Sequence, residues 1–179
     1  MKADSAMLPR TNAAMEGMVI VRSARLDELE ALSAIGLAAW QKGIAPHVPA
    51  EVVGRLNQTN PFVPFLKALG PSVLVAEIDG CPAGIGACET GADQISDVWV
   101  DLAFEGRSAG SGLVKALEDR IRAAGFATVR MQVAAANDRA LGLYKHLGYR
   151  EVWRKVELDT VLETELEKIG LEKRLAAPA

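Results

Sequence analysis

Residues that commonly carry metal or nucleophilic chemistry are scarce in this sequence. Among 179 residues there are two cysteines, Cys81 and Cys88, and two histidines, His47 and His146. The cysteines lie in or beside strand-like sequence without metal-ligand spacing, so we interpret them as reduced, small apolar residues. A zinc site or a Cys–His catalytic site is therefore not expected.

Long apolar runs and a basic surplus are also missing. No stretch approaches the ~18 apolar residues that a membrane span needs, and residues 1–17 lack the continuous apolar core of a signal peptide. The 20 Lys and Arg against 23 Asp and Glu give a net charge of −3, whereas a nucleic-acid binder normally shows a basic surplus on one face. The P-loop and dinucleotide-binding glycine motifs are absent as well. We therefore expect a soluble, cytoplasmic protein that binds neither nucleic acid nor membrane.

Apolar periodicity and turn residues divide the chain into one domain and two short tails. Half of the residues are apolar, which suffices for one well-buried core but hardly for two. We expect a flexible tail at 1–17, the domain at 18–175 and a tail at 176–179. The patterns predict helices at 26–40, 50–58, 111–124 and 137–148, and strands at 18–22, 72–78, 81–89, 94–102, 128–133, 149–158 and 169–175.

Turn signals complete this arrangement. Asp79-Gly80 predicts a hairpin, the segment 42–49 with one Gly and two Pro predicts a loop, and Pro61 and Pro64 interrupt the stretch that follows. Strands come first, and strands then alternate with helices. This order predicts an α/β (α+β) domain, with a mixed, mostly antiparallel sheet of six to seven strands flanked by helices.

The most informative stretch runs from Val98 to Tyr149. A turn rich in Gly and Ser opens the helix expected at 111–124, and a turn that bares backbone N–H groups at a helix start is a ready anion site. Downstream, Asn137 is a good helix N-cap. Tyr144 follows seven residues later, nearly on the same side of the helix, because seven residues make about two turns. Together these features favour a phosphate-bearing ligand with reacting groups beside it.

These motifs, in this order, resemble the GNAT N-acetyltransferase superfamily over the whole domain expected above. The family pattern is a strand ending V-x-P, then Q/R-x-x-G-x-G/A opening a helix, and later N-x-x-A-x-x-x-Y-x-x-x-G-F. The last motif is nearly intact here, as Asn137, Ala140, Tyr144, Gly148 and Tyr149. The order, the spacing and the preceding hairpin make the resemblance specific.

The phosphate-loop motif departs from the family pattern and allows two registers. Arg107-x-x-Gly110-x-Gly112 fits the letters but leaves two extra residues after the strand. A register without a gap places the loop at 105–110 and keeps the apolar face of the following helix in phase, so we prefer it. In that register Leu102 replaces Pro, Glu105 replaces Gln or Arg, and Ser108 replaces the first Gly.

Two of these replacements bear on ligand binding. Ser108 is small enough to leave the N–H groups accessible and can add a hydroxyl donor. A Glu105 carboxylate within ~6 Å of a pyrophosphate repels it unless solvent or Arg107 screens the charge. We therefore expect weaker cofactor binding than in typical members of the family.

The resemblance implies direct transfer of an acetyl group from acetyl-CoA to an amine. It assigns backbone contacts with pantetheine and thioester to the strand, pyrophosphate contacts to N–H groups of 106–111, and a hydrogen bond to pantetheine from Asn137. Tyr144 is the candidate general acid, because a phenol with an ordinary pKa of about 10 is protonated at pH 7 and can donate to a thiolate. The residues expected to bind acetyl-CoA are Val98, Trp99, Val100, Glu105, Gly106, Arg107, Ser108, Ala109, Gly110, Ser111, Asn137 and Tyr144.

The base that takes the amine proton is not identified by the sequence. In the ribosomal-protein N-terminal acetyltransferases, which form one branch of the family, a Glu stands five residues before the Asn; here that position is Gln132, which cannot act as a base. Four residues are candidates by location only, and water is the alternative: His47, Glu89, Asp97 and Asp101.

The acceptor also stays open at this point. We expect an amine of a small molecule or a peptide, with the apolar segment 44–69 on the acceptor side disfavouring a highly cationic one. A homodimer is left open. The alternative function, motivated by Glu105 and Ser108, is a degenerate acyl-CoA-binding or interaction module without turnover, and Tyr144 would then be a packing residue.

Overall fold

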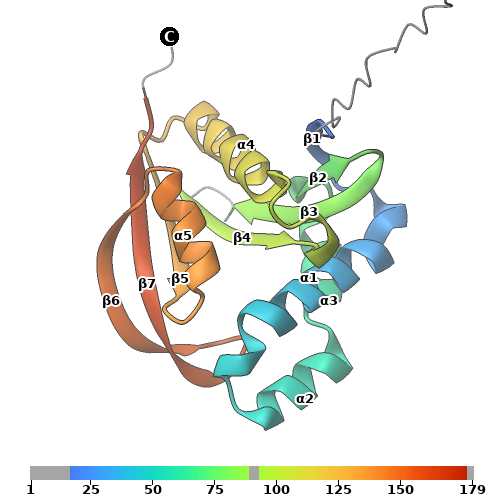
Figure 1. Ribbon diagram of the computed structural model, residues 1–179, viewed down its shortest axis with the longest axis vertical. Coiled ribbons are helices and arrows are strands. Elements are labelled where there is room, and N and C mark those ends of the chain that lie inside the picture. The colour runs from blue at the N-terminus through green and yellow to red at the C-terminus, as the bar shows by residue number, and fades with distance from the viewer. Residues whose placement is uncertain (1–16, 89–92, 177–179) are drawn as a thin grey trace, which may run out of the picture.

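A mixed sheet of seven strands organises the described part of the chain, residues 17–88 and 93–176 of the computed structural model (Figure 1). The strand order is β1-β2-β3-β4-β5-β7-β6, and every neighbouring pair is antiparallel except β4 and β5. This confirms the predicted fold class. The strands are β1 Val19–Ser23, β2 Leu74–Ile78, β3 Cys81–Cys88, β4 Gln94–Val100, β5 Thr128–Ala134, β6 Arg150–Asp159 and β7 Thr164–Arg174.

Five α-helices and four short 3-10 turns connect the strands of the described residues. They are η1 Leu26–Glu28, α1 Leu29–Gly43, η2 Ala45–His47, α2 Ala50–Thr59, α3 Phe62–Leu69, η3 Gly70–Ser72, η4 Leu102–Phe104, α4 Ala109–Ala123 and α5 Asp138–His146. The expected tails lie outside the described residues, apart from Gly17 and Ala176. No helix in the described ranges is long and apolar enough to cross a membrane.

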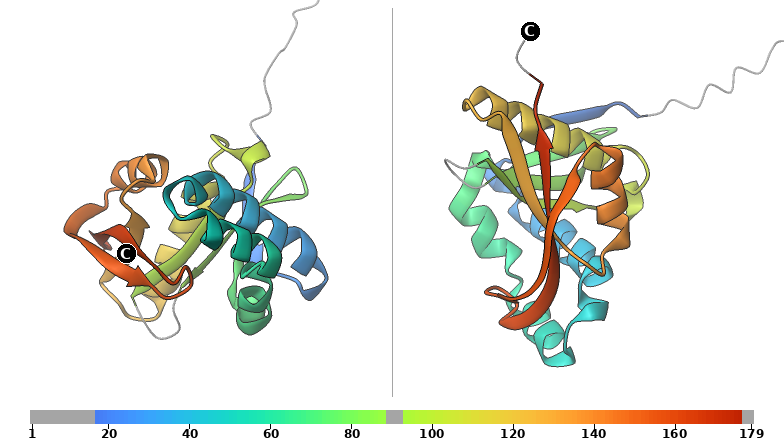
Figure 2. Two further views of the ribbon diagram at one scale, coloured as in Figure 1. Left: turned by 90° about the horizontal axis from the view of Figure 1, so that it is seen from below. Right: turned by 90° about the vertical axis from the view of Figure 1, so that its left-hand side faces the viewer.

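Helices cover both faces of the sheet (Figure 2), and a hydrophobic core lies on each face. On one face α4 buries Leu113 and Leu117 completely and joins the apolar side of α5. On the other face α1 buries Leu32 and Trp40 and packs with α2 and α3. Each helix therefore presents one apolar stripe to the sheet, as its 3.6-residue periodicity requires.

Three elements differ from the sequence prediction by more than two residues or were not predicted as helices. Helix α3 continues through Pro64, because this proline is its third residue and the N–H groups of a first turn have no intrahelical partner to lose. Helix α1 extends to Gly43, into the segment expected to be a loop. Strand β7 begins at Thr164 rather than 169, because its first half alternates charged and half-buried residues and shows no apolar run.

The seam between β4 and β5 is the feature that positions the site. The two strands pair only at Gln94 with Arg130 and at Ile95 with Met131. Beyond these pairs β4 continues to Val100 and β5 to Ala134, but the two strands no longer pair with each other. The parallel strands therefore diverge in the middle of the sheet and leave a gap between their carboxyl ends.

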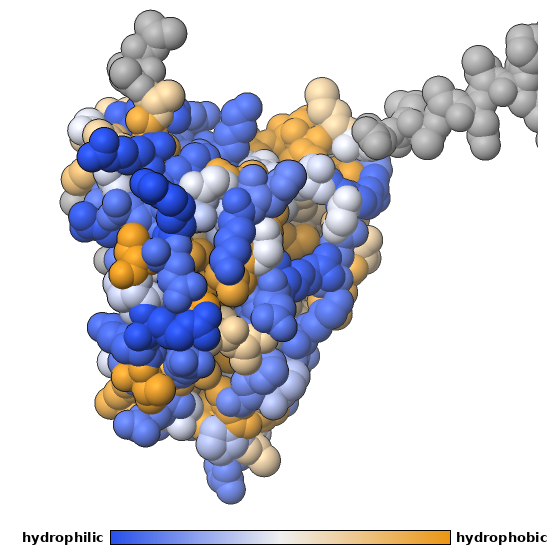
Figure 3. Space-filling view, turned by 60° about the vertical axis from the view of Figure 1, so that its left-hand side comes forward, coloured by the Kyte–Doolittle hydropathy of each residue, from blue (hydrophilic) through white to orange (hydrophobic). Residues whose placement is uncertain are grey.

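The far edge of the sheet is formed by β6. Its outward side chains include Val152, Val156 and Leu158, which are more than half exposed, interspersed with Arg154 and Lys155. Figure 3 shows the side of the molecule that carries this edge as mostly hydrophilic, with separate apolar patches. Charged residues along an edge strand discourage pairing with other chains.

Candidate functional site

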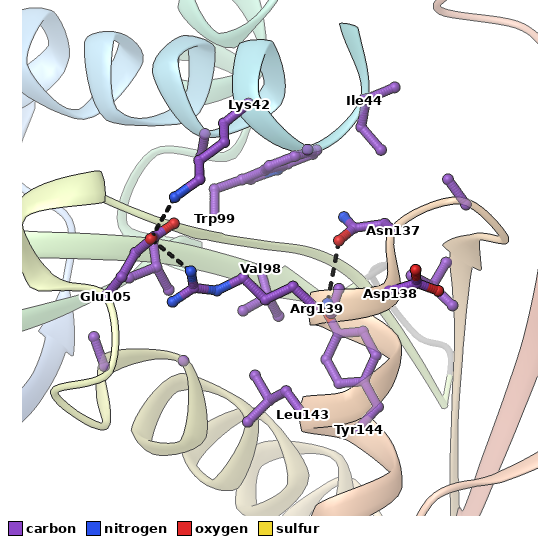
Figure 4. A pocket seen from close by; sticks show the side chains of 18 of the residues that line it. Lys42, Ile44, Val98, Trp99, Glu105, Asn137, Asp138, Arg139, Leu143 and Tyr144 are labelled. Atoms are coloured by element: carbon purple, nitrogen blue, oxygen red, sulfur yellow. Dashed lines mark hydrogen bonds and ion pairs between the residues drawn. The ribbon is translucent and has the colours of Figure 1, made fainter. Parts of the chain in front are cut away.

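A first cavity of about 660 Å³ opens where β4 and β5 diverge. Figure 4 shows its walls, which come from β4, the loop before α4, the beginning of α5 and the end of α1. The structure brings together all but one of the residues expected to bind the cofactor. Those that line this cavity are Val98, Trp99, Val100, Glu105, Gly106, Ser108, Ala109, Gly110, Ser111, Asn137 and Tyr144.

The N-terminus of α4 supplies free backbone donors to this cavity. Ser108 is its N-cap residue, and the helical ladder begins with the bond from Gly112 N–H to the Ser108 carbonyl, 2.9 Å long. The N–H groups of 108–111 therefore precede the ladder and have no intrahelical partner. With the positive end of the helix dipole behind them, they form a site for an anion.

In the register without a gap, Ser108 stands at the position of the first glycine of the family pattern. Its backbone conformation is the one that glycine favours, which supports this register. Ser108 has a φ of +66°, in the left-handed region that glycine adopts without strain. In the other register the two glycines are Gly110 and Gly112, both inside α4. Gly112 faces β1 and not the cavity, since a Cβ there would lie 3.1 Å from Val19.

Gly110 places no side chain beside the free N–H groups at the beginning of α4. A Cβ at this position would lie 3.1 Å from Leu143 on α5 and 3.4 Å from Val100 on β4. A side chain here would enter the space between α4, α5 and β4, where the free N–H groups lie. The small residue at this position therefore keeps the cradle open to a bulky anion such as a pyrophosphate.

Glu105 is screened by two cations across the cavity mouth, and neither is Arg107. Its Oε2 atom accepts hydrogen bonds of 2.6 Å from Lys42 on α1 and of 2.6 Å from Arg139 on α5 (Figure 4). The carboxylate is 18% exposed, whereas both cationic side chains are at least half exposed. Arg107, named above as one possible screen, pairs with Asp79 at 2.8 Å and does not line this cavity.

The backbone of β4 offers further hydrogen-bonding groups to the gap. Asp101 N–H donates a 2.9 Å bond to the Ala83 carbonyl of β3, and the next pair along the two strands is Val100 opposite Gly84. Since antiparallel residues alternate between bonded and non-bonded pairs, the N–H and C=O groups of Val98 and Val100 point away from β3. They face the gap left by β5. Trp99 has the opposite orientation, so its contribution to the cavity comes from its indole ring.

Asn137 holds the beginning of α5 and retains a free amide nitrogen. Its Oδ1 atom accepts a 3.1 Å hydrogen bond from Ala140 N–H, the expected N-cap. Its Nδ2 atom lies toward Gly43 at the end of α1, where a Cβ would approach it to 3.1 Å. The side chain can therefore donate from Nδ2 into the cavity while Oδ1 caps the helix.

Tyr144 reaches the same cavity from α5 and is buried, with 7% of its surface exposed. Its ring packs edge to face on Tyr149, with ring centroids 6.1 Å apart. Burial, and secondarily the negative charge of Asp97, raises the pKa of Tyr144 to about 12. The phenol is therefore protonated throughout the neutral range, and no described residue accepts its proton in a hydrogen bond.

A second cavity of about 640 Å³ lies on the other side of β4, between α3 and the β6–β7 hairpin. It shares wall residues with the first cavity along the diverging strands, so the two cavities meet at the gap. The residues common to both are Ile44, Ser96, Trp99, Gln132, Val133 and Ala134.

The candidate bases are separated by this arrangement. Asp97 lines the second cavity and His47 the first. Asp101 caps η4 by accepting a 2.8 Å bond from Ala103 N–H and lines neither, and Glu89 lies outside the described residues. Within the described ranges, no cluster of three or more His, Cys, Asp or Glu residues could hold a metal ion.

The model of the acetyltransferase (GNAT) family matches residues 38–149, more than half of the chain. The chain therefore belongs to the GNAT acetyltransferase family, whose members are acyltransferases.

Solved structures share the same fold at low sequence identity. A GCN5-related N-acetyltransferase from Rhodopseudomonas palustris matches with a TM-score of 0.70 at 21% identity, over 87% of this chain and 95% of that chain. The PaiA N-acetyltransferase from Thermoplasma acidophilum, in complex with coenzyme A, matches with a TM-score of 0.68 at 17% identity, over 88% of this chain and 99% of that chain. YncA from Salmonella typhimurium, with its cofactor acetyl-CoA, matches with a TM-score of 0.63 at 18% identity, over 90% of this chain and 96% of that chain.

Sequence reasoning missed the two cations at the cavity mouth. Arg139 lies inside the Asn137-to-Tyr144 motif, two residues after the N-cap, so its place on the first turn of α5 was a usable signal. Lys42 was assigned to a loop, and only the extension of α1 carries it to Glu105. That contact joins residues 63 positions apart, a separation that local patterns do not reach.

Proposed function

We propose that this chain transfers an acetyl group from acetyl-CoA to a primary amine of a small molecule or peptide by direct attack of the amine. One observation carries the proposal: the free N–H groups of α4, the β4 backbone on the side left open by β5, and the Tyr144 phenol line a single cavity. A pyrophosphate, a pantetheine arm and a leaving thiolate need these three kinds of group in this order. The PaiA structure with coenzyme A and the YncA structure with acetyl-CoA support it by analogy of fold.

Each residue has a definite task on this proposal. The N–H groups of 108–111 bind the pyrophosphate, and the backbone of Val98 and Val100, with the amide of Asn137, orients the pantetheine and the thioester carbonyl. Acetyl-CoA, when bound, supplies the electrophilic thioester carbon. Holding it beside the amine lowers the barrier chiefly by removing the entropy cost of a bimolecular encounter.

Tyr144 acts on the leaving group. The C–N bond forms and the C–S bond breaks, and the phenol donates to the departing sulfur so that CoA leaves as a thiol. The ammonium form of the acceptor gives up one proton before attack and a second during transfer. One of the two restores the Tyr144 phenol, and the other is released to solvent. Burial keeps the phenol protonated but makes it a weaker acid, so we expect its contribution near the lower end of the usual ~10²–10⁴-fold range.

The test is a pair of measurements on the unmodified protein. Calorimetric titration with acetyl-CoA should show binding, and a free-thiol assay should show CoA release that depends on an added amine, with the acetylated amine identified by mass. Absence of acetyl-CoA binding would refute the proposal. Binding without thiol release across a broad amine panel would instead favour the binding module without turnover. A cytoplasmic location and a homodimer stay predictions from the sequence.

A further inference from the structure

The second cavity has an aromatic wall of three rings, in which Phe62 makes an edge contact with each of the other two. Phe62 lies 5.4 Å from Trp99 and 6.3 Å from Phe65 between ring centroids, at interplanar angles of 83° and 84°. Phe62 is held in place because it packs directly on Gly36 of α1, where any Cβ would collide with its ring. The Phe62 ring is therefore closely packed at the centre of the wall, and the wall favours a flat apolar group.

One carboxylate in this cavity has no cationic partner. Asp159 is occupied, since it accepts bonds of 3.0 Å from Val161 N–H and 2.9 Å from Leu162 N–H and pairs with Lys168 at 3.0 Å. Asp97 accepts a 3.0 Å bond from the Trp99 indole at Oδ1, and within the described residues no cation lies within ion-pair distance of it. Its Oδ2 atom is therefore available to a positively charged ligand.

The position of Asp97 is set by β4. It lies two residues before Trp99 on the strand, beside the wall that both cavities share. The Tyr144 phenol lies on the other side of the gap, close enough to Asp97 for the carboxylate to act on it electrostatically. A nitrogen held by Asp97 therefore sits at the junction, next to the place where the thioester is expected.

A side-chain bridge spans the end of the second cavity near α2. Arg55 donates a 2.6 Å bond to the Leu162 carbonyl and pairs with Glu163 at 2.8 Å, which ties α2 to the turn of the β6–β7 hairpin. Leu162 is buried beneath this contact together with Leu56. This bridge stands in the way of a chain that continues past α2, and so favours a compact acceptor over a peptide.

We infer that the second cavity binds a small primary amine that carries one aromatic or comparably apolar group. The group packs on Phe62, Phe65 and Trp99, and Asp97 pairs with the ammonium and directs the nitrogen to the junction. This assignment of the acceptor rests on the proposed function. A polyamine would leave further ammonium groups unpaired, because Asp97 is the one uncompensated acid among the described residues of this cavity. An α-amino acid would place its carboxylate near Asp97 and Asp159.

The test is calorimetry on protein saturated with CoA, with 2-phenylethylamine as the probe. We expect 2-phenylethylamine to bind at least tenfold more tightly than L-phenylalanine, spermidine or a short peptide beginning with alanine. Asp97→Asn keeps the acceptor for the Trp99 indole and removes only the charge, so the fold should persist. It should weaken 2-phenylethylamine at least about tenfold, which corresponds to about 1.4 kcal/mol. Asp119→Asn, on α4 and outside both cavities, should change nothing.

Each other outcome overturns the inference. Preference for spermidine, for the amino acid or for the peptide contradicts the assigned acceptor class, and an unchanged affinity in Asp97→Asn contradicts the role of the carboxylate. Acetyl-CoA affinity measured in the same preparations separates the two proposals. If acetyl-CoA binds and 2-phenylethylamine does not, the acceptor assignment fails while the proposed function stands; if acetyl-CoA does not bind, the proposed function itself fails.

Discussion

Replacing Glu105 with glutamine should strengthen acetyl-CoA binding, because the carboxylate competes with the cofactor phosphates. Glu105 now holds Lys42 and Arg139 at 2.6 Å each, beside the free N–H groups of α4. A pyrophosphate with two charges at ~6 Å from this carboxylate is repelled by about 1.4 kcal/mol in a water-like dielectric. Glutamine removes that repulsion and leaves both cations free to approach the phosphates. We therefore expect the dissociation constant to fall about tenfold.

The assay is calorimetric titration of acetyl-CoA into Glu105→Gln and the unmodified protein at low and at physiological ionic strength. The gain should shrink with added salt, since exposed charges are screened over about 8–10 Å under those conditions. Asp119→Asn is the matched control, because it makes the same change in net charge away from the cavity. Weaker binding in Glu105→Gln would refute the reasoning. The contacts of Glu105 with Lys42 on α1 and Arg139 on α5 would then organise the cavity, and the register that begins at Arg107 would regain support.

Two further predictions concern the helix start and the N-terminal strand. Ser111→Asp, in the first turn of α4, should leave the fold intact because acids are favoured there. Its negative charge should repel the pyrophosphate and lower the affinity for acetyl-CoA, measured by calorimetry, by an order of magnitude or more. Ser111→Asn is the uncharged control and should bind acetyl-CoA normally. Gly110→Asp should also weaken acetyl-CoA binding, but its side chain crowds Leu143 as well. The hydrogen bonds from Arg22 hold the pKa of Glu28 at about 2, despite the opposing effect of burial. The free energy of unfolding should thus be full above about pH 4.5 and fall by roughly 3 kcal/mol as the pH drops through 2. Urea titrations should show a flatter pH profile for Glu28→Gln.

Local patterns in the sequence were enough to locate most of the first cavity. Asn137 and Tyr144 lie on one helix, so their seven-residue spacing fixes their relative position. The loop before α4 is likewise set by local signals, and small residues around Ser108 indicate where backbone groups are left free. Periodicity also identified all seven strands, because most of them bury at least one face.

The second cavity and the charges at the mouth of the first depend on tertiary packing and could not be predicted. Lys42 and Glu105 meet only because α1 crosses the sheet beside the loop before α4. Phe62 was obscured by the prolines on either side of it, and its ring contact with Trp99 joins elements far apart in the chain. The candidate bases could be named but not placed, since their surroundings come from several strands.

The most direct test of the account is the turnover of Tyr144→Phe relative to its affinity for acetyl-CoA. The variant keeps the ring that packs on Tyr149 and removes only the hydroxyl, so the fold and the cofactor affinity should change little. With an amine that the unmodified protein acetylates, or with slow hydrolysis of acetyl-CoA as the readout, we expect thiol release to fall about 10²-fold. Turnover within about threefold of the unmodified protein, far below the range for a general acid, would contradict the account and return Tyr144 to a packing role.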